Sequence, residues 1–598
     1  MEIPDWMSEV LSQFDGKTES HSETEIAEAL GRARSSRGDL PEDEWKVFLA
    51  EHSVFFLRPS RKPEQGFWGT YFAPMAILTG KDGKDVTSPD ITQLDAESVT
   101  HWENRAETVT DPVMKARYAD ATWDLAKRVA GTKPNHNMAR IASDAYVSAT
   151  ERGLSTIPPF AVQWLVRALD LARSVRDDQR TSEAAEAMVR FYKANLSPKL
   201  VGIWITIFDE LYASQNLLTQ DLIKSMILDL ESMLKRLSTI DEHNEFDPFN
   251  AQAVGERLIR HYRSVGDADS VARVVKTFGG AFEQQANGAG AMLATAWLQP
   301  IAERYEQEGL KAEAEALQNK LEKRYAEITN ELKTYSLPIR FTQEQVDELF
   351  RYLIVDKDLA STLKNIGTYF IPKVGEARKL IQSKGSVAPL LSLMPIELLD
   401  SSGRPKAHIG STEDDAEGHL YYQLTQIMTF SDPFLYLVLE RVREQFAPSA
   451  EDLTSFLYEC PVFVESRKGI LQQGLAAYLE HDFVKSIHIL VPQLEEVLRN
   501  LLAMIGVPTV KNVPRHPGIT DVKSMNNVLE EERIREILPE DVWRYLTLLY
   551  IDRRGVNLRN DLAHGLIVLE GFNEYSSNRV LHSLLALTPI TIKPRRMS

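Results

Sequence analysis

Hydrophobic residues recur at steps of three and four along most of this chain. The clearest case lies between residues 481 and 504, where the apolar positions are Ile487, Leu490, Val491, Leu494, Val497, Leu498 and Leu501. That spacing is typical of an amphipathic α-helix. The same spacing predicts further helices over 113–130, 137–152, 158–174, 181–195, 218–237 and 249–264. Strand-like patterns are few, so the sequence predicts an all-α protein.

Short polar breaks separate these predicted helices. Helices that follow one another at roughly 20-residue steps predict antiparallel pairs stacked as an irregular α-solenoid. No repeat consensus is clean enough for a tetratricopeptide array. The aromatic stretch 66–79 predicts a short extended segment, and residues 80–85 predict a turn after it.

Three domains are predicted, because 598 residues exceed what one hydrophobic core organises. An N-terminal helical array, 1–340, closes with a long charged helix over 310–334 and a break at 335–341. A middle helical segment, 341–460, contains a loop near 399–418. The C-terminal domain, 461–598, is expected to contain a helix to 480, the helix 481–504, a polar linker over 506–526, helices near 527–536 and 539–551, and a last helix near 574–588.

Charge and cysteine content narrow the class of protein. With 68 Lys and Arg against 86 Asp and Glu, the net charge is −18, which argues against nonspecific nucleic-acid binding by the whole surface. Cys460 is the single cysteine, so a disulfide within the chain and a cysteine zinc cluster are excluded, and its apolar neighbours predict a buried thiol. Neither a secretory signal nor a bilayer-spanning apolar run is visible. A cytoplasmic protein without a membrane partner is expected.

The strongest hint of chemistry is the heptapeptide 559–565, which reads R-N-D-L-A-H-G. On a helix, Asn560 and His564 share a face, and Arg559 lies about 140° and ~7.5 Å from His564, a gap that an arginine side chain can bridge. Histidine transfers protons near neutral pH, and the arginine fork binds phosphate. RNA cleavage needs a base for the ribose 2′-OH, a cation at phosphorus and an acid for the leaving oxygen. One motif supplies one histidine, so a dimer that pairs two motifs is expected.

The string Arg559-Asn560-Asp561-Leu562-Ala563-His564 resembles the R-x(4–6)-H signature of HEPN domains, which often carry a polar residue directly after the arginine. With Gly565 included, it is similar to the RNxxxHG signature of an uncharacterised family, domain of unknown function 4209, and the helix 475–502 resembles that family's upstream helix. The resemblance covers about 461–598. It implies an all-α bundle that dimerises and, in many members, a metal-independent ribonuclease of bacterial toxin or antiphage defence systems. Arg559 and His564 would then be catalytic, and Asn560 would orient them.

Two alternatives stay open. In a structural interpretation, Arg559 and Asn560 cap and pair at a helix start, while His564 and Gly565 occupy a packed turn. In a functional alternative, the chain is a non-enzymatic helical scaffold whose HEPN-like domain mediates dimerisation or nucleotide binding. If the chain is a nuclease, the N-terminal array is expected to bind a protein trigger or inhibitor.

Four further charged residues are candidates to support the motif or contact RNA. Glu495 and Arg499 lie on one stripe of the helix 481–504. That stripe either holds the motif's arginine or histidine or, as the favoured interpretation, forms a solvated face with an ion pair. Arg553 and Arg554 precede the motif in a segment, 551–598, that holds seven bases and four acids.

No cofactor is predicted. The loop 403–419 holds two histidines and four acids, but their spacing matches no metal motif, so a solvated acidic loop is favoured over a metal site. The Gly-Ala-Gly-Ala run at 288–291 follows no predicted strand and is not a dinucleotide fingerprint. The sequence contains no phosphate-binding loop, no G-x-S-x-G elbow and no H-E-x-x-H motif.

Overall fold

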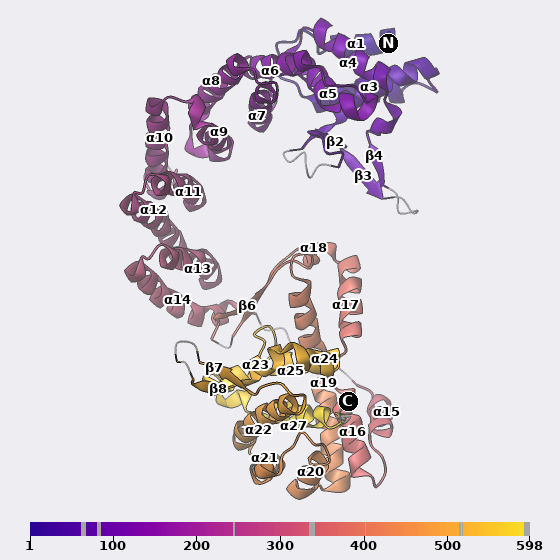
Figure 1. Cartoon of the computed structure of the whole chain (residues 1–598), viewed down its shortest axis with the longest axis vertical. Helices are drawn as coiled ribbons and strands as arrows, with labels where there is room; N and C mark the ends of the chain where they lie inside the picture. Colours follow the sequence, from indigo (N-terminus) through magenta and orange to yellow (C-terminus); the bar gives the residue numbers. More distant parts are fainter. Residues whose placement is uncertain are drawn as a thin grey trace. The chain divides into compact units, whose positions relative to one another are not determined.

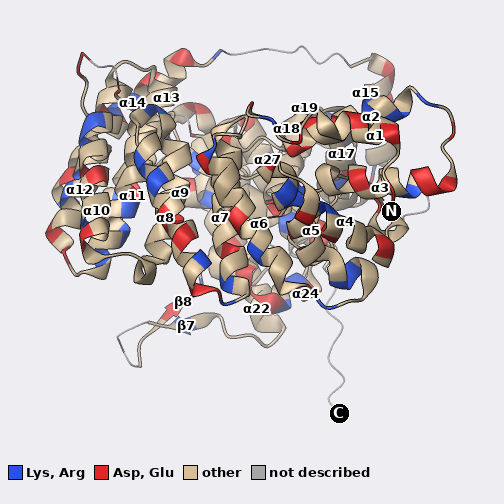
Figure 2. Cartoon of the chain, turned by 90° about the horizontal axis from the view of Figure 1, so that it is seen from above, with Lys and Arg blue, Asp and Glu red and all other residues tan. Residues whose placement is uncertain are grey.

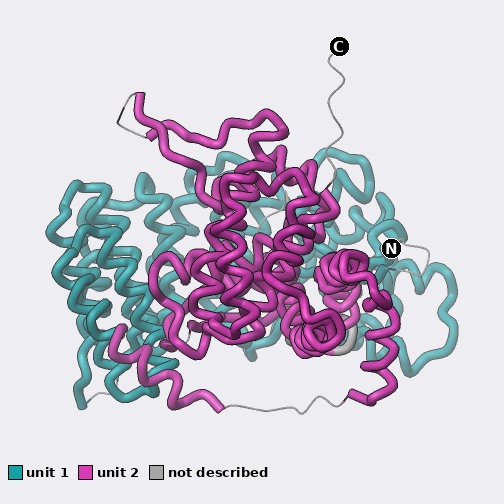
Figure 3. Tube along the Cα trace, turned by 90° about the horizontal axis from the view of Figure 1, so that it is seen from below, with its two compact units in different colours: residues 1–321 teal, residues 322–598 magenta. Residues whose placement is uncertain are grey.

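The chain forms two compact units, residues 1–321 and 322–598, whose division falls inside helix α14 (Figure 3). The computed structural model describes residues 1–60, 67–79, 85–242, 245–333, 341–400, 402–513, 516 and 518–590. Most of the predicted break at 335–341 and of the predicted turn at 80–85 therefore lies outside the described residues. Across those ranges helices dominate, and the strands form four two-stranded antiparallel sheets. The predicted all-α class is confirmed.

Unit 1 is built almost wholly from helices (Figure 1). They are α1 (Asp5–Ser12), α2 (Glu23–Ser35), α3 (Glu42–Phe56), α4 (Ala96–Thr108), α5 (Pro112–Ala130), α6 (His136–Glu151), α7 (Pro158–Ser174), α8 (Asp178–Asn195), α9 (Val201–Ala213), α10 (Gln220–Ser238), α11 (Pro248–Ser264), α12 (Ala268–Asn287), α13 (Ala291–Gln307) and α14 (Lys311–Glu331). Its strands are β1 (Arg58–Pro59), β2 (Phe72–Ala73), β3 (Ala76–Thr79) and β4 (Asp85–Ser88). The extended segment predicted over 66–79 thus contains β2 and β3.

Packing in unit 1 follows the order of the sequence. Each helix from α4 to α9 packs on its neighbours along the chain, and so does each helix from α10 to α13, while α11 also contacts α9. Next-nearest helices touch as well, such as α6 with α8 and α10 with α12. This succession of antiparallel neighbours confirms the predicted irregular helical array.

One kind of three-residue turn recurs in the array. Between α7 and α8, Arg176 takes a left-handed conformation (φ 54°) and Asp177 accepts a backbone N–H of the next helix. Between α11 and α12, Gly266 (φ 74°) and Asp267 do the same. The left-handed residue reverses the chain, and the aspartate satisfies a free N–H at the helix start. The two turns share only the left-handed residue and the aspartate after it. Helices therefore repeat along the array without a strict sequence consensus.

Charged side chains of both signs are interspersed over the helices of both units (Figure 2). In unit 1 some of them are buried and hold neighbouring elements together. The guanidinium of Arg167 on α7 makes a bidentate ion pair with Asp120 of α5, with Nη2 2.6 Å from Oδ1. Asp124, also on α5, accepts the backbone N–H groups of Tyr71 and Phe72 at 3.1 and 2.9 Å, and burial raises the pKa of its carboxyl to about 6.

Unit 2 is also mainly helical. Its helices are α15 (Gln343–Leu353), α16 (Leu359–Tyr369), α17 (Val374–Val387), α18 (Pro389–Ser392), α19 (Ala416–Phe446), α20 (Ala450–Leu457), α21 (Lys468–Leu479), α22 (Phe483–Met504), α23 (Met525–Glu530), α24 (Glu532–Ile537), α25 (Glu540–Tyr550), α26 (Leu558–Ala563) and α27 (Glu574–Leu587). Its strands are β5 (Ile396–Leu399), β6 (Pro405–Ile409), β7 (Val510–Asn512) and β8 (Thr520–Val522).

Helix α27 lies at the centre of unit 2, and every residue from 577 to 587 is buried. It packs on α16, α19 and α22. The buried guanidinium of Arg579 donates to Asp432 Oδ1 (2.6 Å) and to the carbonyl of Phe370 (3.1 Å). The predicted boundary at 460 therefore falls inside a unit whose single core draws helices from both sides. Cys460 lies in this core, which confirms the prediction that its thiol is buried.

Two segments of unit 2 predicted to be irregular contain strand pairs instead. The loop predicted near 399–418 begins inside the β5–β6 hairpin, and the polar linker over 506–526 contains the β7–β8 hairpin. Those two predictions were wrong in this respect, because strands of three to five residues are too short for an alternating pattern to stand out.

Candidate active site

The motif begins on the short helix α26, which a tight loop joins to α25. The backbone N–H of Val556 donates to the carbonyl of Leu548 at 2.9 Å. Gly555 lies so close to the same carbonyl that any Cβ there would collide with it. Asn557, directly before the helix, takes a left-handed conformation (φ 60°), which asparagine tolerates better than most residues. The Gly-Val-Asn sequence thus fixes how the chain enters α26.

The end of the motif closes the same helix. Gly565 takes a left-handed conformation (φ 67°), its N–H donates to the carbonyl of Leu562 (3.2 Å), and the N–H of Leu566 donates to that of Asp561 (2.8 Å). These two bonds form a Schellman motif, which favours glycine at this position. His564 is the last residue before the glycine, and its ring is exposed, with no hydrogen bond or ion pair to any residue that the structure describes. The packed turn of the structural interpretation is therefore wrong for these two residues.

Arg559 is held from a different helix. Its Nε lies 2.9 Å from Oε2 of Glu495 on α22. The other carboxylate oxygen of Glu495 accepts from Nη1 of Arg499 at 2.9 Å. The ion pair expected on this stripe is therefore present, but the side chains of Glu495 and Arg499 are only 14% and 17% exposed and are not solvated as expected. The side chain of Arg559 is 25% exposed and stays within reach of a ligand.

Asn560 connects Arg559 to the start of the helix. Its Nδ2 donates to Oδ1 of Asn557 (2.8 Å) and to the carbonyl of Ile551 (3.3 Å), while its Oδ1 accepts from Nη1 of Arg559 (3.3 Å). Asn557 in turn donates to Oδ1 of Asp561 at 2.7 Å. Asn560 therefore turns its acceptor toward the guanidinium and its donor toward the side chain of Asn557 and the carbonyl of Ile551.

The two arginines before the motif have different surroundings. Arg554 makes a bidentate ion pair with Asp552, with Nε and Nη2 at 2.9 and 2.7 Å from its two oxygens. Its guanidinium also lies 4.5 Å from the ring centre of Tyr421. Arg553 is exposed and has no ion-pair partner within the described ranges. Arg553 is thus free to meet an anion, whereas Arg554 holds its own loop. The remaining bases of the tail, beyond residue 590, lie outside the described residues.

The site places a cation and an imidazole at opposite ends of one short helix. Nη2 of Arg559 makes no hydrogen bond to the part of the chain described, so the fork keeps a donor for a phosphate oxygen. The exposed ring of His564 is available to transfer a proton. Within the motif, His564 is the one imidazole, and it can act as base or as acid in a single step but not as both.

The acidic loop 403–419 has structural partners. Asp415 accepts a backbone N–H at the start of α19, Glu417 pairs with Arg544 at 2.7 Å, and Nε2 of His419 meets a backbone carbonyl at 2.9 Å. Within the described ranges, no group of three or more His, Cys, Asp or Glu side chains is arranged to hold a metal ion.

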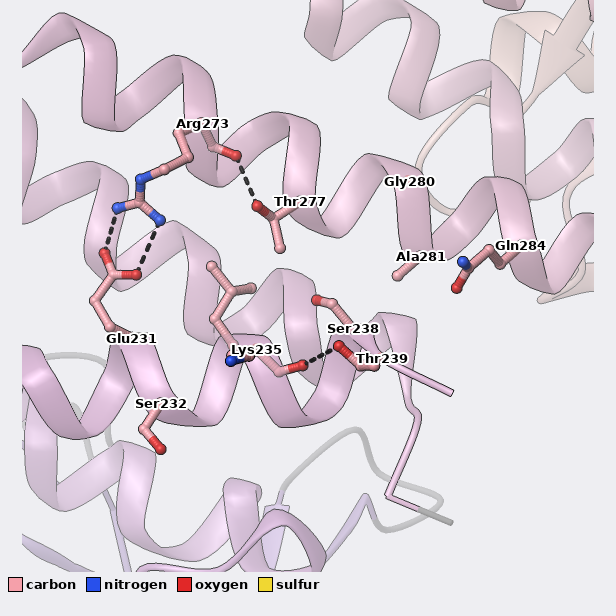
Figure 4. A pocket seen from close by; sticks show the side chains of 11 residues that line it. Glu231, Ser232, Lys235, Ser238, Thr239, Arg273, Thr277, Gly280, Ala281 and Gln284 are labelled. Carbon is pink, nitrogen blue, oxygen red and sulfur yellow. Dashed lines mark hydrogen bonds and ion pairs between the residues drawn. The ribbon is translucent and has the colours of Figure 1, made fainter. Parts of the chain in front are cut away.

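A groove that no residue pattern marks in the sequence lies between α10 and α12 of unit 1 (Figure 4). It encloses about 680 Å³. Glu231 and Arg273 form an ion pair at one end, with contacts of 2.6 and 3.0 Å, and Lys235 is exposed beside them. Its wall is open at Gly280, where a Cβ would meet nothing within 4 Å. The groove offers polar groups to a ligand, but its described lining residues include no paired nucleophile and base.

Comparison with known families bears on unit 1. Residues 5–184 match a domain of unknown function (DUF7380). That match runs from α1 into α8 and does not include the motif. No curated protein matches the chain. Among the helices described, none is long and apolar enough to cross a membrane.

Proposed function

We propose that this chain is a metal-independent endoribonuclease of the HEPN type. The observation that carries the proposal is the arrangement on α26, where Arg559 is oriented by Glu495 and Asn560 while His564 is exposed. A guanidinium held by a carboxylate is pre-organised to receive a phosphate, and an exposed imidazole is accessible to a substrate as a proton donor or acceptor.

The reaction is transfer of the phosphoryl group within RNA. An imidazole takes the proton of a ribose 2′-OH, the 2′-oxygen bonds to the adjacent phosphorus, and the bond from phosphorus to the 5′-oxygen breaks. A second, protonated imidazole gives its proton to the 5′-oxygen. Arg559 stabilises the added negative charge on the phosphorus oxygens. The products are a 2′,3′-cyclic phosphate and a 5′-hydroxyl, and the step needs no metal.

The second imidazole would come from another copy of the chain. Leu566, Val568 and Leu569 follow the motif directly, and all three side chains are exposed. Exposed apolar residues gathered beside a functional group are typical of an interface. A homodimer through the C-terminal domain would cover them and bring two copies of His564 to one RNA strand.

The proposed biological role is that of a cytoplasmic effector in a bacterial defence or toxin system. A nuclease that cleaves cellular RNA must be restrained until it is needed. The helical array of unit 1, with its groove between α10 and α12, would bind the protein trigger or inhibitor.

The test is RNA cleavage in EDTA by the full chain and by Arg559→Ala and His564→Ala. Cleavage that yields cyclic phosphate ends and is lost in both variants supports the proposal. His481→Asn is the matched control, because it removes another exposed imidazole while asparagine tolerates the left-handed backbone there (φ 59°). Equal cleavage by all four proteins would contradict the proposal.

A scaffold is the second candidate function, and two observations favour it. Glu495 already neutralises Arg559, and Asn560 is engaged with Asn557. A chain that forms a homodimer, leaves RNA intact with and without a trigger, and keeps its dimer in the His564→Ala variant would be such a scaffold.

A further inference from the structure

A lysine from a distant hairpin contacts the loop that leads into the motif helix. Lys406 lies on β6, and its Nζ donates to the carbonyls of Gly555 and Val556, each at 3.1 Å. The same Nζ lies 3.9 Å from Oδ2 of Asp561 in the motif. Lys406 precedes Val556 by 150 positions, so the contact is a product of the fold of unit 2.

The surroundings of this ammonium group favour its contacts over water. The side chain of Lys406 is 21% exposed, and burial lowers the pKa of its ammonium, while Asp561 acts in the opposite direction. A cation in such a place is stable only when dipoles or charges compensate for the lost water. The two carbonyls and the carboxylate supply that compensation. Conversely, the ammonium stabilises two carbonyls in a loop that already contains the close approach at Gly555 and the left-handed Asn557.

The contacts continue from Lys406 to the catalytic arginine. Asp561 accepts from the side chain of Asn557, and Asn557 accepts from Asn560. Asn560 then accepts from Nη1 of Arg559. The three links from Asp561 to Arg559 are hydrogen bonds of 2.7 to 3.3 Å, so a shift of the loop at 555–557 would alter the direction in which the guanidinium points.

The turn of the hairpin, close to Lys406, packs on α14. Gly403, in the turn between β5 and β6, takes φ 80° and lies against the backbone of Tyr325, in the part of α14 that belongs to unit 2, where a Cβ would collide. The hairpin that carries Lys406 is therefore in direct contact with that part of α14.

We propose that Lys406 is a positioning residue for the nuclease site: its ammonium holds the loop 555–557 and Asp561 so that Asn560 presents Arg559 to the phosphate. The proposal rests on the proposed function, because it names a further residue of that same site. Lys406 does not touch the substrate and acts only through the loop.

The test compares Lys406→Met and Lys406→Arg with the wild-type chain. Methionine keeps most of the aliphatic stem and removes the charge, so kcat for RNA cleavage should fall about tenfold while KM changes less than about twofold. Arginine can reach the same carbonyls and should restore part of kcat. Lys364→Met is the control, because its ammonium lies on the surface, 3.9 Å from Glu459, and its loss should leave kcat unchanged.

A second readout does not depend on cleavage. The amides of His564 and Leu566, which are bonded to Asn560 and Asp561, should exchange hydrogen about tenfold faster in Lys406→Met and at the wild-type rate in Lys364→Met. Wild-type kcat together with wild-type exchange in Lys406→Met would overturn the proposal. If the wild-type chain cleaves no RNA, the proposed function is wrong. Hydrogen exchange at the amides of His564 and Leu566 then tests by itself whether Lys406 orders the motif. If Lys406→Met does not fold, Asp561→Asn replaces it, with the same expected results.

Discussion

The Nε atom of Arg559 lies 2.9 Å from Oε2 of Glu495, although 64 positions of sequence separate the two residues. The contact joins the motif helix α26 to α22, the amphipathic helix whose apolar face packs in the core of unit 2. Because α22 is anchored by that face, Glu495 is a rigid support, and the direction of the guanidinium follows from it.

Replacing Glu495 by glutamine should reduce RNA cleavage without unfolding the chain. The amide oxygen still accepts a hydrogen bond, but the charge that orients Arg559 is lost, so a fall of about tenfold to a hundredfold in kcat is expected. In an Arg559→Ala background the same change should have little further effect, because the two residues act together. Glu496→Gln, which alters only the partner of Arg499, should retain wild-type cleavage. Additive losses in the double variant would contradict this coupling.

Replacing Gly565 by alanine should destabilise the end of α26. The left-handed backbone there (φ 67°) disfavours a Cβ by about 1 kcal/mol, although the surrounding space is open. Hydrogen exchange at the amide of Leu566 should become faster, while the thermal unfolding of the whole unit changes little. Gly565→Asn should be milder, since asparagine tolerates this conformation. Equal exchange in the alanine variant and the wild type would show that the turn is not under this constraint.

Unit 2 should lose stability as the pH falls below about 6.5, because His582 is buried in its neutral form. Its Nε2 faces the carbonyl of Ile366, which can only accept, so Nε2 carries the proton and Nδ1 accepts from the hydroxyl of Tyr545 at 2.7 Å. Burial first, and then the nearby charge of Arg579, lower the pKa of His582 well below its usual value near 6.5. The unfolded chain therefore binds a proton that the folded chain does not.

The expected slope is up to about 1.4 kcal/mol of unfolding free energy per pH unit between pH 6.5 and 5, where few carboxylates titrate. Denaturant unfolding at a series of pH values measures it. His582→Gln should flatten the slope, whereas His564→Ala, which changes an exposed ring, should leave it as in the wild type. An unchanged slope in His582→Gln would assign the pH dependence to other groups.

A fragment of residues 461–598 should not fold on its own. Helix α27 packs on α16 and α19, and Arg579 bonds to Asp432 and to the carbonyl of Phe370, so the fragment would expose the central helix and leave a buried charge unpaired. The fragment 322–598 keeps these partners and should show a cooperative thermal transition by circular dichroism. A cooperative transition in the shorter fragment would instead support the domain boundary expected at 460.

The sequence predicts those parts of this protein that depend on neighbouring residues. The apolar period places helix 158–174 on the same residues as α7, and the predicted helix 481–504 differs from α22 by two residues at its start. The heptapeptide 559–565 can likewise be recognised from the sequence, because its arginine, asparagine and histidine are close in the chain. The β5–β6 hairpin was missed, since a strand of five residues carries too little pattern.

By itself, then, the sequence determined the all-α class, the order of the helices and the residues that carry the candidate chemistry, because periodicity and capping act within a few residues. Only the tertiary structure decided that Glu495 and Lys406 meet the motif, and that α16 and α19 share a core with α27. Such contacts join residues 64 to 150 or more positions apart, and they follow from how apolar faces pack after the helices have formed, which no local pattern encodes.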